Sequence, residues 1–200
     1  MLGSKKSFGL MGLLAIGLLA CAASGAQAAL ILGDANLNGA QEVPPVATAA
    51  IGVSILNVDS NTGLFDLELF VSGITQAQLA GVGPNNTPVH IHNAPPGVNG
   101  PIVVDLGFLG TIDDIGTLGF KLAVEGAQFG GTQGGLNSDT ATNIANLLAG
   151  NMYVNVHTNA NGGGEIRGQI NAIPEPTSIG LGLIGVCGLA AACRRRKRRA

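Results

Sequence analysis

Three histidines are the residues best suited to chemistry in this chain of 200 residues. His90 and His92 form a His-Ile-His sequence in an apparent β-strand, and His157 lies in a later strand candidate. Residues two apart on a strand share one face of a sheet, so the imidazoles of His90 and His92 point the same way, about 7 Å apart. If the two strands are neighbours, three imidazoles can converge. Such a set suits copper or zinc and leaves a coordination position open.

A second interpretation of these residues needs no ion. Arg167 is the only arginine between residues 29 and 173, and it shares a strand face with Glu165, across a hairpin from His157 and Asn155. A carboxylate–guanidinium pair there would satisfy buried polar groups and fix the strand register. We take this structural polar network of Glu165, Arg167 and Asn155, without a cofactor, as the preferred interpretation. The alternative is a mononuclear copper or zinc protein, either a metal carrier or a weak redox enzyme.

The segment that must position these residues, 29–173, has the pattern of an all-β domain. Apolar and polar side chains alternate along residues 65–71, as in a half-buried strand, and turn-forming residues 59–63 join it to the preceding strand. The strand candidates are residues 30–37, 49–58, 65–71, 89–92, 102–106, 119–125, 151–158 and 165–170. Two short helices are expected at residues 75–80 and 138–148, and a flexible loop at 131–135. The predicted fold is an antiparallel β-sandwich or barrel of about seven or eight strands.

The distribution of charge and cysteine excludes several classes of function. Residues 29–173 contain two basic and 11 acidic residues, a net charge of −9, whereas nucleic-acid binding needs clustered cations. All three cysteines lie outside this segment, which therefore has no disulfide, thiolate metal site or cysteine nucleophile. It also lacks the G-x-S-x-G sequence of serine hydrolases. We assign no catalytic residue and expect a protein that is not an enzyme.

Residues 1–28 have the composition of a secretory signal peptide. Lys5 and Lys6 precede an apolar run at residues 8–20, which is too short to span a bilayer. Ala26 and Ala28 are the small residues that a signal peptidase reads, so cleavage is expected after Ala28. The alternative is a lipoprotein signal with a lipid on Cys21.

Residues 174–200 have the composition of a membrane anchor. An uncharged segment, 177–193, is marginally long enough to span a bilayer. A cytoplasmic basic tail follows, because such clusters stay on that side of the membrane. The tail consists of Arg194, Arg195, Arg196, Lys197, Arg198 and Arg199. The central domain is therefore expected outside the cytoplasm, anchored to the inner membrane at least transiently.

The order of Pro174-Glu175-Pro176, apolar segment and basic tail resembles the PEP-CTERM sorting signal of Gram-negative bacteria. This resemblance implies recognition by an exosortase-type sorting enzyme, with cleavage near the three-residue motif and delivery to the cell envelope or an extracellular matrix. Candidate partners are then signal peptidase, the exosortase and matrix polysaccharide.

Four motifs in the central segment together resemble the CHRD domain first described in chordin. They are Glu42-Val43-Pro44-Pro45, His90-Ile91-His92 leading into residues 96–101, residues 153–158, and residues 164–169. The resemblance implies an extracellular β-rich module without an agreed catalytic activity. Its signature positions are Glu42, Pro44, Pro45, His90, His92, Gly100, Asn155, His157, Glu165, Arg167 and Gly168.

A looser similarity links the histidine pattern to copper/zinc superoxide dismutase, a β-sandwich with a strand-borne His-x-His and a later strand histidine. This chain has no fourth histidine to bridge two metals and no disulfide in its central segment. Dismutation is therefore not expected even with copper bound. The sequence thus predicts an exported structural or adhesive β-domain.

Overall fold

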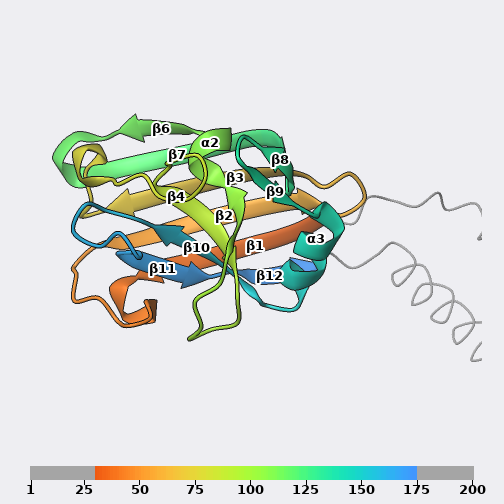
Figure 1. Ribbon diagram of the computed structural model, residues 1–200, viewed down its shortest axis with the longest axis horizontal. Helices are drawn as coiled ribbons and strands as arrows, with labels where there is room; N and C mark the ends of the chain where they lie inside the picture. The colour runs from red at the N-terminus through yellow and green to blue at the C-terminus, as the bar shows by residue number, and fades with distance from the viewer. Residues whose placement is uncertain (1–29, 175–200) are drawn as a thin grey trace, which may run out of the picture. The chain divides into compact units, whose positions relative to one another are not determined.

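The computed structural model describes residues 30–174, which form a mostly antiparallel β structure with a few short helices (Figure 1). The strands are β1 (Leu30–Asn38), β2 (Ile51–Asp59), β3 (Leu64–Ser72), β4 (Val89–Asn93), β5 (Ile102–Asp105), β6 (Thr111–Asp114), β7 (Gly119–Gln128), β8 (Gly131–Gln133), β9 (Leu136–Ser138), β10 (Met152–Val156), β11 (Ile166–Gln169) and β12 (Asn171–Pro174). The α-helices are α2 (Leu106–Leu109) and α3 (Thr140–Leu148). Single 3-10 turns are η2 (Gly39–Gln41), η3 (Gln76–Gln78) and η4 (Gly116–Leu118).

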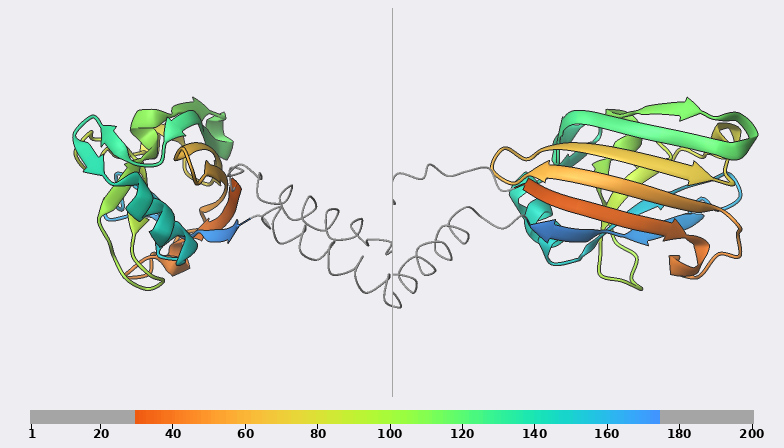
Figure 2. Two further views of the ribbon diagram at one scale, coloured as in Figure 1. Left: turned by 90° about the vertical axis from the view of Figure 1, so that its right-hand side faces the viewer. Right: turned by 180° about the vertical axis from the view of Figure 1, so that it is seen from behind.

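One sheet contains ten of the strands and curls over on itself into a sandwich. Its order is β5-β4-β10-β11-β1-β2-β3-β7-β6, with β12 also paired to β1. The long strands β1, β2, β3 and β7 form one layer, seen side by side in Figure 2, and β4, β10 and β11 form the other. Strand β11 pairs with β1 only at the last residue of β1, where Arg167 is opposite Asn38. The predicted sandwich is therefore confirmed.

Alternating side chains from both layers fill the core. Along β3 every second residue is buried, because Phe65, Leu67, Leu69 and Val71 all point inward, as the sequence predicted. From the opposite layer, Ile91 and Val154 enter the same core cluster. This unit has its own core, and all its sheet pairings lie within it, so it can be produced as an isolated domain.

The turns and helices follow the local chemistry of the sequence. The Asp59 side chain accepts hydrogen bonds from the backbone N–H groups of Asn61 and Thr62, and Gly63 takes a left-handed conformation (φ 72°) that completes the β2–β3 turn. These hydrogen bonds lower the pKa of Asp59. Helix α3 begins after Asp139, whose carboxylate accepts from the Thr142 N–H at 2.7 Å. The helix predicted at residues 75–80 is only the 3-10 turn η3.

The segment 131–135, predicted as a flexible loop, contains strand β8 and the turn into β9. The buried side chain of Gln133 explains the difference. It donates to the carbonyls of Gln128 and Gly130 and accepts the Asp105 N–H at 2.7 Å. Long-range contacts of this kind leave no periodic signal in a glycine-rich sequence. Strands β6 and β12 were also not predicted, because neither four-residue run alternates apolar and polar side chains.

The two ends of the domain lie side by side. Strand β12 pairs with the start of β1, with Pro174 opposite Ile31 and Ile173 opposite Leu32. Among residues 30–174, no helix is long and apolar enough to span a membrane. The predicted signal peptide, the apolar segment 177–193 and the basic tail all lie outside the described residues.

Candidate functional site

The strand that carries His90 and His92 lies next to the strand that leads to His157. Strands β4 and β10 are antiparallel neighbours, with Tyr153 opposite His92 and Asn155 opposite His90. The side chains of these four residues occupy the face of the layer that points away from the core. The sheet topology makes β4 and β10 neighbours, and the three histidines can converge only because of this pairing.

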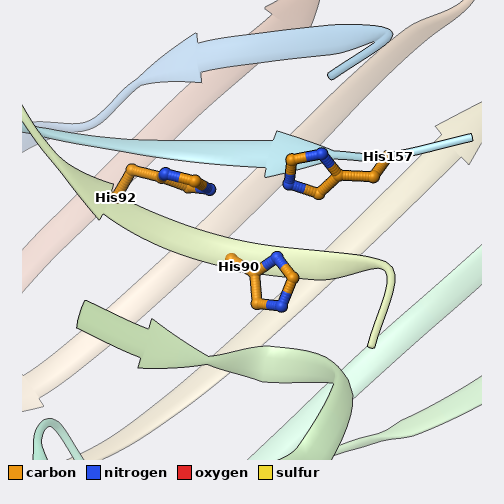
Figure 3. Close-up of side chains that lie close together, drawn as sticks. All are labelled: His90, His92 and His157. Carbon is orange, nitrogen blue, oxygen red and sulfur yellow. The ribbon is translucent and has the colours of Figure 1, made fainter. Parts of the chain in front are cut away.

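The three imidazoles gather on this face (Figure 3). His157 follows the last residue of β10, and its backbone N–H donates to the carbonyl of Pro88 at 2.8 Å, which extends the β10–β4 ladder by one residue. The ring centres are 5.2 Å apart for His90 and His157, 5.6 Å for His92 and His157, and 5.9 Å for His90 and His92. One ring nitrogen of each histidine lies within 4.8 Å of one from each of the others.

Although they face away from the core, the histidines are shielded from solvent. The exposed fractions of His90, His92 and His157 are 0%, 8% and 3%. Three connecting segments provide contacts over this face: residues 81–87, where Gly83 lies near the His90 ring, residues 94–101 and residues 158–164. The site is therefore an enclosed polar layer beneath loops.

The backbone holds two of the rings in one tautomer. His92 Nδ1 lies 2.9 Å from the carbonyl oxygen of Gly100, and His157 Nδ1 lies 3.1 Å from that of Gly162. A carbonyl oxygen can only accept, so Nδ1 carries the proton in both rings. In each ring Nε2 then carries a lone pair that has no hydrogen-bond partner among the described residues.

The third ring, that of His90, is held through its Nε2 atom by a chain of two hydrogen bonds. His90 Nε2 lies 2.8 Å from Thr87 Oγ1, and that hydroxyl donates its only proton to Asp105 Oδ1. The Thr87 oxygen must therefore accept from His90, which places the proton on Nε2 and leaves Nδ1 with a free lone pair. The fully buried Asp105 carboxylate lies 3.7 Å from the same nitrogen.

Burial keeps all three rings neutral at neutral pH. It lowers the pKa of His90 to about 3, although the Asp105 carboxylate acts in the opposite direction. Burial lowers the pKa of His92 to about 4 and also lowers that of His157, in both cases against the effect of the hydrogen bond to a carbonyl. The rings therefore offer lone pairs without first having to lose a proton.

The partner of Arg167 differs from the predicted one. Arg167 forms a buried ion pair with Glu42 at 3.0 Å and not with Glu165; both Arg167 and Glu42 are only 3% exposed. Burial raises the pKa of Glu42, while the attraction of Arg167 opposes this rise. Glu42 comes from the segment after β1, more than a hundred residues from Arg167 in sequence, so spacing along the chain could not pair them.

Arg167 also connects the ion pair to the histidines. Its guanidinium lies 4.0 Å from the centre of the Tyr153 ring, and the opposing His92 ring stacks on Tyr153 at 5.0 Å, nearly parallel. The guanidinium donates further to the carbonyl of Val98 and to the side chain of Asn99, which fixes the loop that covers the site.

Glu165 has a separate role in joining two segments. Its carboxylate accepts from the Thr158 hydroxyl at 2.6 Å and from the Thr48 hydroxyl at 2.9 Å. Burial alone would raise the pKa of Glu165, but these hydrogen bonds lower it below its usual value. The predicted network thus divides into an Arg167–Glu42 pair and a Glu165–threonine pair. Asn155 is buried beside them, with its Oδ1 unpaired among the described residues.

Sequence reasoning alone did not assign Thr87 and Asp105 to this site. A carboxylate that ends the apolar strand β5 was the available signal for Asp105, because a buried charge needs a partner. Seven of the signature positions named above gather on this one face. They are Glu42, His90, His92, Gly100, Asn155, His157 and Arg167.

The fold and this site define a β-sandwich domain with a polar layer buried outside its hydrophobic core. The chain belongs to the CHRD domain family, whose model matches residues 34–170. A second family model, the PEP-CTERM protein-sorting motif, matches residues 172–198. No curated protein and no solved structure is significantly similar to the chain.

The sorting motif marks the protein for export and for membrane anchoring before it is sorted, and it implies processing by an exosortase-type enzyme. Neither family is known for catalysis. The predicted exported, exosortase-sorted, non-catalytic β-domain protein agrees with both matches.

Proposed function

We propose that this protein is a structural or adhesive component of the bacterial envelope or extracellular matrix, in which its β-domain contacts neutral or basic polysaccharide. The observation that carries the proposal is the position of the sorting motif. The Pro-Glu-Pro sequence begins at Pro174, the last residue of β12, so the domain is complete where the motif starts. Cleavage after this point would release an intact sandwich.

A solvent-exposed apolar stripe on the layer of long strands supplies a contact surface. It consists of Ile51, Val53 and Ile55 on β2 together with Phe70 on β3, and these side chains are between 48% and 59% exposed. Phe70 lies directly opposite Val53. Contiguous exposed apolar residues of this kind often mark interaction sites.

The surroundings of the stripe favour a sugar as the bound partner. Beside it lies a hollow of about 390 Å³ lined by Ile55, Asp66, Glu68 and Glu125, among others. Carboxylates accept hydrogen bonds from sugar hydroxyls, and an aromatic ring packs against the apolar face of a pyranose. The domain's net charge of −9 disfavours acidic polymers, which leaves neutral or basic polysaccharide.

Two comparisons test the proposal in a Gram-negative host that carries an exosortase. The Glu175→Ala, Pro176→Ala double variant should accumulate in the inner membrane, whereas the wild type should reach the matrix fraction. With the isolated domain, Phe70→Ala should weaken binding to extracted neutral matrix polysaccharide roughly 5-fold, the value of one aromatic contact.

Phe108→Ala is the matched control, because Phe108 is also half-exposed but lies on α2, away from the stripe. Equal binding by the wild type and the Phe70 variant, or no binding by either, would overturn the proposed contact surface. Sorting that does not depend on the Pro-Glu-Pro sequence would overturn the delivery route.

A further inference from the structure

We propose that His90, His92 and His157 form a mononuclear binding site for a transition ion that prefers imidazole ligands, either zinc or copper. The proposed polysaccharide contact involves the opposite layer of the sandwich, so the two proposals stand or fall separately. Three features support this site: unpaired lone pairs, the spacing of the rings and the groups that hold the rings.

All the unpaired buried side-chain atoms of the described residues belong to this one face. Three of the six are the free ring nitrogens His90 Nδ1, His92 Nε2 and His157 Nε2, and the other three belong to Glu42, Asn155 and Arg167. A buried polar atom without a partner costs about 1–3 kcal/mol, so three such nitrogens on one face are a substantial destabilisation. One ion accepting three lone pairs would remove that cost at the histidines.

The spacing of the rings fits a single ion. An ion about 2.1 Å from each nitrogen lies about 3.2 Å from each ring centre, so three rings in a tetrahedral or trigonal set stand about 5.2–5.5 Å apart. The observed separations of 5.2, 5.6 and 5.9 Å are close to this range. The nitrogens, within 4.8 Å of one another, must approach to about 3.4 Å. Rotation of the rings, with little movement of the strands, would achieve this.

The hydrogen bonds on the far side of each ring have the arrangement that metal-binding histidines need. A ligating imidazole usually donates its other N–H to a carbonyl or carboxylate, which fixes the ring and its tautomer. Gly100 and Gly162 do this for His92 and His157, and Thr87 relays His90 to Asp105. A histidine network that only stabilised the fold would be expected to pair the second nitrogen of each ring as well, and these three nitrogens are unpaired among the described residues.

The charges around the site suit a cation. Three neutral imidazoles contribute no charge, and the positive charge of Arg167 is balanced by Glu42 at 3.0 Å. Asp105 is the remaining buried anion, 3.7 Å from the His90 ring, and its charge would partly offset that of the ion. With nitrogen ligands alone, the site excludes calcium and magnesium, which require oxygen ligands.

The test uses domain 29–174, purified without nickel or chelator and then titrated separately with zinc, cuprous and cupric ions against a chromophoric competitor. One ion per chain and a raised melting temperature are expected for at least one of these metals. Nitrogen-15 NMR of the histidine rings gives an independent readout. It should show protons on His92 Nδ1, His157 Nδ1 and His90 Nε2, with the metal shifting only the other three nitrogens.

Matched variants separate metal binding from folding. In His92→Asn and His157→Asn the side-chain amide can still donate to the Gly100 or Gly162 carbonyl, and in His90→Gln it can still donate to Thr87. Each variant loses only the free lone pair, so each should weaken binding at least 100-fold while the domain remains folded. Unchanged binding in these variants would place the ion elsewhere. An absence of stoichiometric binding by the folded wild-type domain for all three ions would overturn the proposal and leave the histidines with a structural role.

Discussion

The buried neutral histidines should make the metal-free domain unstable in mild acid. An unfolded histidine has a pKa of about 6.5, whereas burial holds those of His90 and His92 at about 3 and about 4. As the pH falls below 6.5, the unfolded chain takes up protons that the folded domain cannot bind. The domain is therefore stable near pH 7. Its free energy of unfolding decreases as the pH falls from about 6.5, the unfolded pKa, towards the folded values of about 4 and about 3.

The expected loss is large on the scale of domain stability. At pH 5 each unfolded histidine gains about 2 kcal/mol from protonation, so His90 and His92 together lower the free energy of unfolding by about 4 kcal/mol between pH 7 and pH 5. His157 acts in the same direction, because its pKa is also lowered. A typical domain has only about 5–15 kcal/mol in total.

Urea unfolding of chelator-treated domain 29–174 at pH 7, 6 and 5 measures this loss. The His92→Asn variant has one fewer group to protonate, so its loss should be about 2 kcal/mol smaller than that of the wild type. The raised pKa of Glu42 acts in the opposite sense, but its contribution is common to both proteins and cancels in the comparison. Equal losses in the two proteins would show that His92 is not held neutral by burial, and the reasoning would fail.

Two further predictions concern the elements around the histidines. Arg167→Ala leaves the buried Glu42 carboxylate unpaired and should cost about 3–5 kcal/mol of unfolding free energy, whereas Lys121→Ala, which breaks an exposed pair with an acidic residue, should cost about 1 kcal/mol or less. Gly164→Ala should cost about 1–3 kcal/mol or more, because φ is 128° and a Cβ would lie 2.5 Å from buried oxygens. Gly162→Ala meets nothing within 4 Å and should be nearly neutral. Urea unfolding checks each pair, and a control as damaging as its partner would contradict the assigned contacts.

Local chemistry in the sequence determined most of the secondary structure. The alternation along residues 65–71 predicted which side chains of β3 enter the core, and the Asp59–Gly63 turn predicted the β2–β3 hairpin. Helix α3 lies within the segment 138–148 that was predicted as a helix, and the Asp139 side chain caps its first turn. These features depend on residues close together in the chain, whose effects are visible in the sequence. The short strands β6, β8, β9 and β12 were not predicted. Strand β12 pairs with the distant strand β1. Strand β6 pairs with the next strand, β7, and β8 pairs with β9, but these runs of three or four residues are too short to show a clear alternation.

For the site, the sequence supplied the candidates and the tertiary structure decided the arrangement. The sequence alone predicted that His90 and His92 share a face, because they are two residues apart on one strand. Only the pairing of β4 with β10 brings His157 beside them, and only the segment after β1 brings Glu42 to Arg167. Strand order in a sheet depends on contacts between residues far apart in sequence. The predicted Glu165–Arg167 pair is wrong, because the fold places Glu42 3.0 Å from the Arg167 guanidinium, while Glu165 bonds to Thr48 and Thr158.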